Sequence, residues 1–297
     1  MKNKMSTLLC PFVIIGVLLI LLAGCNKEDN NNPEPVNIAT VQIPAGTFTM
    51  QASFIQVLRQ VNETQYQVTL SAFLMSKCEI TNAEYAAFLN SKSIDSTGLY
   101  SAGQYPGEVL IYASSGSFDW GLHCINGQWR TVAGYENHPV INVTWYGAVE
   151  FATYAGGTLP TEAQWEYACR GNTTTPFYTG DCLSTSHANF DWSYPYDMCI
   201  DTISAYPNKT TAVGSYASNA YGLHDMHGNV REWCSDLYDL YPTTAQTNPT
   251  GGIYGIERVT RGGSWYNYPW ICRSAHRHSN EPFAYGTLIG FRIVFLP

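Results

Sequence analysis

The sequence predicts one α+β domain with little regular secondary structure and long ordered loops. Two capping-box motifs precede short amphipathic segments, which indicates short helices. Several short segments alternate apolar and polar residues, and the stretches between them are rich in Gly, Ser and Tyr without periodicity. Only 13% of the 297 residues are charged, against about 25% in an ordinary soluble domain. A surface of Tyr, Asn, Ser and Thr is typical of an extracytoplasmic protein.

Residues 1–24 have the pattern of a bacterial lipoprotein signal peptide. Lys2 and Lys4 precede an apolar run from Phe12 to Ala23 that is too short to span a bilayer comfortably. The run ends in Leu-Ala-Gly before Cys25, which resembles a lipobox and predicts cleavage before Cys25 and lipidation of its thiol. The alternative is an ordinary secretory signal with a cysteine at this position by chance.

Residues 25–39 then form the lipidated cysteine and a flexible tether, because they are polar, rich in Asn and Pro, and aperiodic. Lys27-Glu28-Asp29 resembles the acidic tag of some surface lipoproteins. We therefore expect an outer-membrane lipoprotein that is attached through its lipid and exposed at the cell surface. The net charge of −8 and the absence of a basic stripe argue against binding to nucleic acid.

The first elements of the domain at 40–297 are expected in the order strand, strand, helix. Alternation predicts strands over Val41–Met50 and Tyr66–Leu74. A capping box formed by Thr81 and Glu84 starts a helix from about Asn82 to Asn90. A Gly/Ser/Tyr-rich insertion follows, with a small hairpin around residues 125–129.

The second half is expected to hold two further helices and a final pair of strands. Val140–Val143 reads as a short strand, and Thr144 caps a helix through Tyr154. A second capping box at Thr161 starts a helix that stops at Gly171. The closing strands are expected at 258–265 and 290–295.

Residues 220–233 are the stretch around which the chain is organised. Gly222, Gly228 and Asn229 exclude a regular helix or strand, while four apolar residues anchor the stretch to a core, namely Leu223, Met226, Val230 and Trp233. Asp225 and Glu232 flank the Gly-Asn turn, and carboxylates converging with turn carbonyls suit Ca²⁺, which takes about six to eight oxygen ligands. The alternative is an Asx-turn whose acids are solvated or pair with Arg231.

Seven cysteines remain after Cys10 leaves with the signal and Cys25 takes the lipid. They are Cys78, Cys124, Cys169, Cys182, Cys199, Cys234 and Cys272. An oxidising compartment permits disulfides, and an odd count leaves at least one thiol free or paired outside the chain. A bond between Cys182 and Cys199 would close the loop between them.

Seven blocks resemble the formylglycine-generating enzyme, or sulfatase-modifying-factor, family and occur in the family's order. They are Glu79–Tyr85, His138–Trp145, Leu159–Tyr167, Ala220–Trp233, Arg261–Trp265, Arg273–Arg277 and Gly290–Arg292. The resemblance covers residues 40–297 and implies the family's compact variant of the C-type-lectin-like fold.

The resemblance also implies a structural calcium site. Its ligands would be Asp225, the carbonyls of Gly228 and Val230, and Glu232. A second family site would begin at Asn189, with Asp201 as the one downstream candidate ligand.

Active members of the family oxidise a substrate cysteine to formylglycine with two thiolates that bind Cu(I), a metal that soft sulfur ligands favour. Counted from Ser264, a catalytic candidate, the first thiolate position holds Asn267 and the second holds Cys272. Counted back from Arg273, Cys272 instead falls near a structural position, and the resemblance then implies a disulfide with Cys169. A Trp that lines the family's active site is replaced by Arg231.

These departures predict an envelope lipoprotein that has diverged from copper oxidase chemistry. It would bind a protein, peptide or glycan on the face beside residues 225–233 and 261–278, or act as a scaffold in a surface complex. The alternative is an active formylglycine-generating oxidase in which Cys272 and a second thiol from elsewhere bind Cu(I).

Overall fold

The computed structural model describes residue 1 and residues 36–53, 56–116, 119–197, 199 and 207–296. The predicted signal peptide, Cys25, most of the tether and Asp201 lie outside these residues. The chain divides into two compact units, residues 1–34 and 35–297, and every helix and strand described belongs to the second. Within the described ranges, no helix is both long and apolar enough to cross a membrane.

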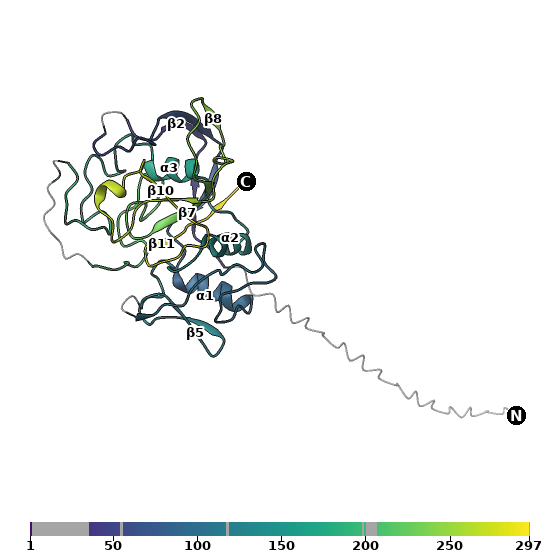
Figure 1. Cartoon of the computed structure of the whole chain (residues 1–297). Coiled ribbons are helices and arrows are strands. Elements are labelled where there is room, and N and C mark those ends of the chain that lie inside the picture. Colours follow the sequence, from purple (N-terminus) through teal and green to yellow (C-terminus); the bar gives the residue numbers. More distant parts are fainter. Residues whose placement is uncertain (2–35, 54–55, 117–118, 198, 200–206, 297) are drawn as a thin grey trace. The chain divides into compact units, whose positions relative to one another are not determined.

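The described residues of the second unit form short strands, three α-helices and long loops (Figure 1). The helices are α1 (Asn82–Ser91), α2 (Trp145–Tyr154) and α3 (Glu162–Arg170), with a 3-10 turn at Pro269–Ile271. The strands are β1 (Thr40–Ile43), β2 (Gly46–Met50), β3 (Tyr66–Leu70), β4 (Phe73–Ser76), β5 (Leu122–Ile125), β6 (Gln128–Thr131), β7 (Arg231–Leu237), β8 (Gln246–Thr247), β9 (Arg258–Arg261), β10 (Arg277–Asn280), β11 (Ile289–Gly290) and β12 (Val294–Phe295). The predicted α+β class with low regular content is confirmed.

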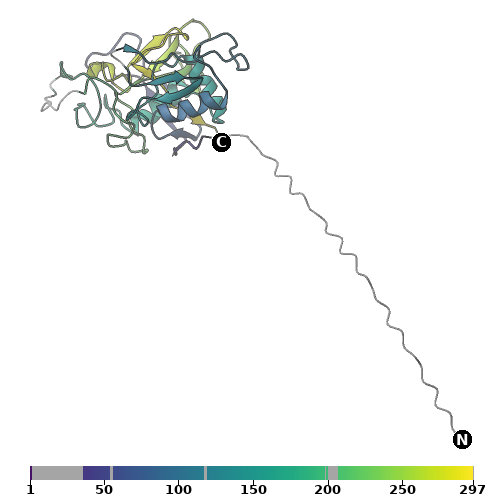
Figure 2. The same ribbon diagram turned by 90° about the horizontal axis from the view of Figure 1, so that it is seen from below.

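Strands from distant parts of the sequence pair in small sheets, in the orders β1-β4-β12, β10-β9-β7-β11 and β2-β3-β8. In the four-stranded sheet, Glu232 of β7 lies opposite Arg261 of β9, which lies opposite Arg277 of β10. Figure 2 shows the same ribbon from below. Charged residues of this sheet therefore face the start of α3, to which their side chains bind.

The helix predictions are confirmed, including both capping boxes and the left-handed Gly171 that ends α3. The hairpin is confirmed as β5-β6, joined by Asn126 and Gly127, both with positive φ as a tight hairpin turn requires. Helix ends and tight turns depend on local chemistry, which explains why the sequence predicts them well.

Several strand predictions are wrong in extent or pairing. The two N-terminal strands each divide, at residues 44–45 and 71–72, so that β3 and β4 join different sheets. Of residues 140–143, only Val143 makes an isolated bridge, because Asn142 has a left-handed backbone (φ 59°) that interrupts a strand. The predicted strand at 258–265 ends at Arg261, since Gly262 and Gly263 have φ of 95° and 72°. It pairs with β7 and β10. The predicted strand at 290–295 is interrupted, with its first residue in β11 and its last two in β12.

Residues 220–233 are anchored by apolar side chains as predicted, and these side chains enter three different core clusters. Leu223 and Met226 lie in the core beneath α3, Val230 lies in a small cluster with Trp265, and Trp233 lies in the core of α1 and α2. All four anchoring side chains are fully buried. The last residues of the stretch correct the prediction of a loop, because β7 begins at Arg231.

Candidate functional site

Ser264 and Asn267 form a tight turn after the Gly-Gly pair. The Ser264 hydroxyl donates to Asn267 Oδ1 at 2.8 Å, and the Asn267 amide N–H donates to the Ser264 carbonyl at 2.9 Å. The Asn267 carbonyl accepts from the Asp191 N–H at 2.9 Å, which ties this turn to the loop at 191–194. Asn267 therefore stabilises the turn at the position where the resemblance predicts the first thiolate of an active family member.

Cys272 is fully buried beneath Gly263. A Cβ on Gly263 would lie only 2.5 Å from Cys272 Sγ, so this position requires glycine. The Gly228 and Ser264 backbone groups and the Arg231 charge lower the pKa of the thiol, but burial outweighs them and raises its pKa to about 12. Cys272 is a neutral thiol packed in a core cluster with Phe177 and other aromatic residues.

The expected Cys169–Cys272 disulfide is wrong, because both residues are free thiols. Cys169 Sγ lies 3.6 Å from Ser274 Oγ and 3.9 Å from His227 Nδ1. His227 Nδ1 in turn lies 2.7 Å from the Cys272 carbonyl, and His227 Nε2 accepts from the Tyr178 N–H at 3.0 Å. Burial lowers the pKa of His227 to about 3, so a neutral imidazole donates to the carbonyl and occupies the space beside Cys169.

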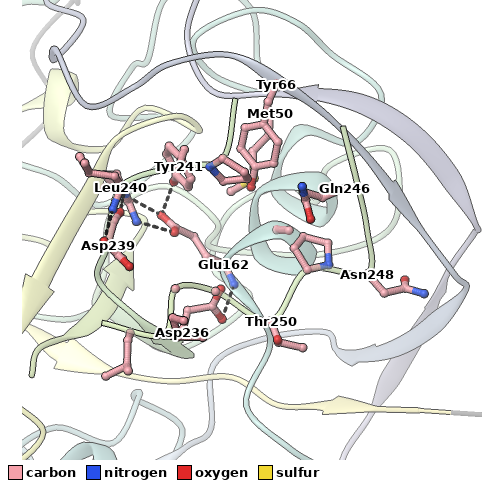
Figure 3. A pocket seen from close by; sticks show the side chains of 18 of the residues that line it. Met50, Tyr66, Glu162, Asp236, Asp239, Leu240, Tyr241, Gln246, Asn248 and Thr250 are labelled. Atoms are coloured by element: carbon pink, nitrogen blue, oxygen red, sulfur yellow. Dashed lines mark hydrogen bonds and ion pairs between the residues drawn. The ribbon is translucent and has the colours of Figure 1, made fainter. Parts of the chain in front are cut away.

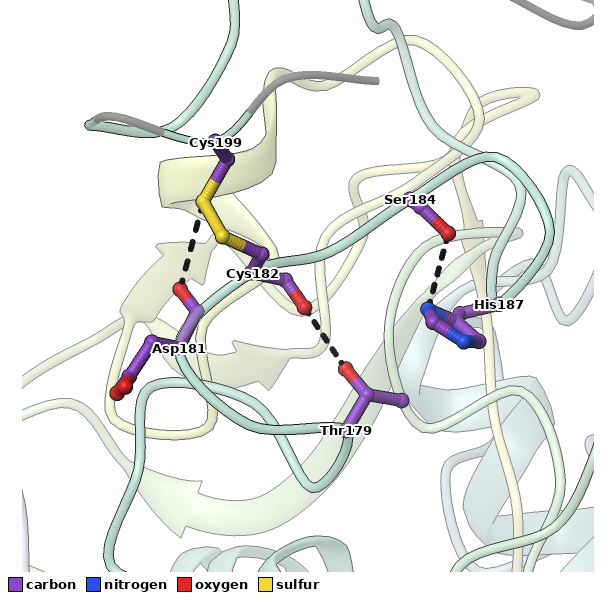
Figure 4. Close-up of a disulfide and its surroundings, with 6 residues drawn as sticks. All are labelled: Thr179, Asp181, Cys182, Ser184, His187 and Cys199. Atoms are coloured by element: carbon purple, nitrogen blue, oxygen red, sulfur yellow. Dashed lines mark hydrogen bonds between the residues drawn. A yellow bond between two sulfur atoms is a disulfide. The ribbon is translucent and has the colours of Figure 1, made fainter. Parts of the chain in front are cut away.

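The Cys182–Cys199 disulfide is present, as the sequence analysis suggested (Figure 4). It closes a loop of 17 residues. Thr179 donates its hydroxyl to the Cys182 carbonyl at 3.0 Å beside it. The five free cysteines in the described ranges are Cys78, Cys124, Cys169, Cys234 and Cys272.

Glu232, a predicted calcium ligand, is held by Arg292 and Trp165. Arg292 donates through Nε and Nη2 at 2.6 and 2.7 Å, and Trp165 Nε1 donates at 2.7 Å. The alternative in which the acids of this stretch pair with Arg231 is therefore wrong for Glu232. Arg231 lies near Cys272 and His278 instead, and burial, followed by the Arg231 charge, lowers the pKa of His278.

Asp225 keeps one carboxylate oxygen without a partner. Oδ2 accepts from the Gly214 N–H at 2.6 Å, while Oδ1 is buried without a hydrogen bond. Glu79 Oε2 and Asn189 Oδ1 are likewise buried without partners. The Asn229 side chain lies between these two residues, since it donates to Glu79 Oε1 and accepts from Asn189 Nδ2. Burial, above all, raises the pKa of Asp225 to about 6, and burial and Asp225 raise that of Glu79.

These unpartnered oxygens are the donor type that a hard cation needs, so Asp225 fits the predicted calcium site. Glu232 fits only if its carboxylate is shared between the cation and Arg292. Within the described ranges, no group of three or more His, Cys, Asp or Glu side chains converges on a point that would hold a metal ion. The residues also do not fit a linear Cu(I) site, since Asn267 holds the position where the resemblance predicts one thiolate and Cys272 is fully buried.

An aromatic group that the sequence analysis did not identify surrounds the Ser264–Asn267 turn. Tyr194 and Tyr266 are 57% and 58% exposed. Tyr268 contacts Tyr194 edge-on, with ring centroids 4.9 Å apart, and lies 4.7 Å from the Trp270 ring. Exposed aromatic residues that converge from two loops are typical of binding surfaces. The repeated Tyr and Trp at 266–270 are the sequence signal that could have identified them.

Comparison with known proteins places these residues in a family. A model of the sulfatase-modifying factor enzyme 1-like domain matches residues 26–296. The formylglycine-generating enzyme of Mus musculus is 30% identical, with 88% of this chain and 76% of the mouse protein covered. The serine/threonine-protein kinase pkn1 of Chlamydia caviae is 33% identical over 90% of this chain, but the chain spans only 39% of that protein. The structure of PvdO from Pseudomonas aeruginosa superposes with a TM-score of 0.64 at 26% identity, covering 86% of this chain and 93% of PvdO. That match confirms the predicted fold class.

Proposed function

The chain belongs to the sulfatase-modifying factor enzyme 1-like family, and we propose that it binds a ligand rather than oxidising a substrate cysteine. The observation that carries the proposal is the pair Asn267 and Cys272. Asn267 hydrogen-bonds to Ser264, and Cys272 is a buried neutral thiol. A Cu(I) site of two thiolates needs both sulfurs accessible and ionised.

The proposed binding surface is the aromatic group of Tyr194, Tyr266, Tyr268 and Trp270. Aromatic side chains supply large contact areas at low conformational entropy, which suits recognition of a protein, peptide or glycan. The buried turn at Ser264–Asn267 holds these rings on a rigid base, so little ordering is needed on binding. A scaffold role in a surface complex would use the same face.

Two assays test this function. The full chain, reduced and loaded with Cu(I), is incubated with a Cys-x-Pro-x-Arg peptide, and aldehyde formation is followed by mass spectrometry. No conversion is expected; conversion that disappears in Cys272→Ser would establish the oxidase instead. Binding to envelope proteins and to a glycan array is then compared for Tyr266→Ala and for Tyr285→Ala, a matched exposed tyrosine that stacks on Tyr112. Only Tyr266→Ala should reduce binding.

We also propose that the protein is an outer-membrane lipoprotein anchored through Cys25 and facing the cell surface. A double- or triple-acyl anchor is needed for stable attachment, which a lipidated amino-terminal cysteine supplies. Cys25→Ala should abolish incorporation of an alkyne-labelled fatty acid and release the protein from membranes. Labelling that persists in this variant would contradict lipidation at Cys25.

A further inference from the structure

A second site is suggested by a cavity of about 540 Å³ between the start of α3 and residues 246–254 (Figure 3). Its volume lies within the range of about 300–1,000 Å³ that is usual for ligand pockets. Its lining includes none of Ser264, Asn267 and Cys272, nor any of the four aromatic residues proposed above. Its occupant is therefore a question separate from the function of that face.

Asp236 supplies a carboxylate oxygen to this pocket. The side chain is only 4% exposed, and Oδ2 accepts from the Glu162 N–H and the Ser235 hydroxyl, both at 3.0 Å. Oδ1 takes no hydrogen bond from any residue that the structure describes. A Cβ on Gly251 would lie 2.8 Å from Oδ1, so the loop passes close to the carboxylate only because this residue is glycine with a φ of 85°.

The pocket is lined by more acidic than basic side chains, because Glu162, Asp236 and Asp239 share it with one arginine, Arg277. Glu162 is neutralised, because Arg277 donates to both of its oxygens at 3.0 and 2.8 Å and Arg261 donates at 2.8 Å. The Arg277 guanidinium also donates through Nη1 to the Asp239 carbonyl at 2.8 Å. No arginine or lysine in the described ranges forms a salt bridge with the carboxylates of Asp236 and Asp239.

Large apolar side chains at the rim are exposed. Leu240, Ile253 and Tyr254 are 83%, 80% and 74% exposed. Such side chains pack against the methylene stem of a long cationic residue, while its charged end reaches an acid at the bottom.

We propose that this pocket binds the cationic side chain of a lysine or arginine on a peptide or partner protein. The buried carboxylate of Asp236 accepts from the cation, Asp239 adds negative potential at the opening, and the apolar rim contacts the stem and its neighbours. A neutral sugar would leave the ionised carboxylate of Asp236 without a counter-ion.

The protonation of Asp236 makes binding depend on pH. Burial, and then the charge of Glu162, raise the pKa of Asp236 to about 7. A bound cation favours the ionised carboxylate, so affinity rises with pH as Asp236 loses its proton, by up to about tenfold between pH 6 and pH 8. The other charged or titratable groups around Asp236 are Glu162, Arg277, Arg258, Tyr66 and Cys234. Asp239 lies against Gly252 of the loop at 246–254.

The test uses the full chain in a neutral detergent and a Gly-Ser-Arg-Ser-Gly peptide, observed by saturation-transfer NMR at pH 8. A matched peptide carries citrulline, which has the shape of arginine without its charge. We expect the arginine peptide to bind at least tenfold more tightly than the citrulline peptide. Asp236→Asn should remove this preference, while Asp119→Asn, a half-exposed acid on the β5 side, should retain it.

Asp239→Asn provides a second variant if Asp236→Asn does not fold, because Asp239 is partly exposed. This variant should weaken the preference for the arginine peptide. Equal binding of both peptides, or a preference that survives in both variants, would overturn the proposal. Binding of cellopentaose that depends on Asp236, without binding of the arginine peptide, would make this a sugar site. Tyr266→Ala should keep the preference, which separates this site from the aromatic surface.

Discussion

Glu63 and Arg273 form a buried ion pair, and the loss of one partner should destabilise the fold strongly. Both side chains are fully buried, and Arg273 donates through Nη1 and Nη2 to the two Glu63 oxygens, each at 2.8 Å. The same guanidinium donates to the carbonyls of Leu58 and Trp270. One pair thus joins the loop at 56–63 to the segment that contains Cys272.

Glu63→Gln is the informative perturbation, because it keeps the shape and removes the charge. The Arg273 guanidinium then remains buried without its counter-ion, which costs about 3–5 kcal/mol of unfolding free energy. Replacing both residues, as in Glu63→Leu with Arg273→Met, removes both charges together. The double variant should therefore lose less stability than Glu63→Gln alone, which is the signature of a desolvated pair.

Urea unfolding followed by tryptophan fluorescence measures these free energies, with Asp119→Asn as the control. Asp119 pairs with His123 at the surface, where the two side chains are 43% and 35% exposed. Loss of this pair should cost less than about 1 kcal/mol of unfolding free energy. A change below about 1 kcal/mol for Glu63→Gln, or a double variant less stable than Glu63→Gln, would show that Arg273 does not depend on its buried counter-ion.

Four further predictions concern stability. Gly263→Ala should destabilise the fold by about 2 kcal/mol or more, since a Cβ would meet Cys272 Sγ at 2.5 Å. Gly127→Ala has a similar φ of 75° but open space around the added Cβ, so it should cost about 1 kcal/mol. Equal losses of unfolding free energy in urea would contradict this difference. Reduction of Cys182–Cys199 should cost about 3 kcal/mol for a loop of 17 residues, and the Cys182→Ser, Cys199→Ser variant should lose its sensitivity to dithiothreitol. The pKa of Asp236 is raised to about 7 in the folded state, so its stabilising contribution is present at about pH 4 and is lost as the pH rises to about 7; Asp236→Asn should remove that part of the pH dependence of the melting temperature. If calcium binds at Asp225, adding it after chelation should raise the melting temperature of the wild type but not of Asp225→Asn.

The elements set by local chemistry were predictable. Thr81 with Glu84, and Thr161 with Gln164, satisfy the first backbone donors of their helices within three residues, so the sequence alone determined where α1 and α3 begin. The anchoring of residues 220–233 was also predictable, because apolar side chains spaced between turn residues have only the core to enter.

Tertiary structure decided which groups meet across the sequence. Glu232 forms its salt bridge with Arg292 rather than with Arg231, because the neighbouring residues Arg231 and Glu232 of β7 point to opposite faces of the sheet. Cys169 remains a thiol because His227 occupies the space beside it and binds the Cys272 backbone, and no spacing in the sequence encodes that insertion. The Asp236 pocket arises where β7, α3 and residues 246–254 converge, and such a convergence depends on long-range packing that local patterns do not specify.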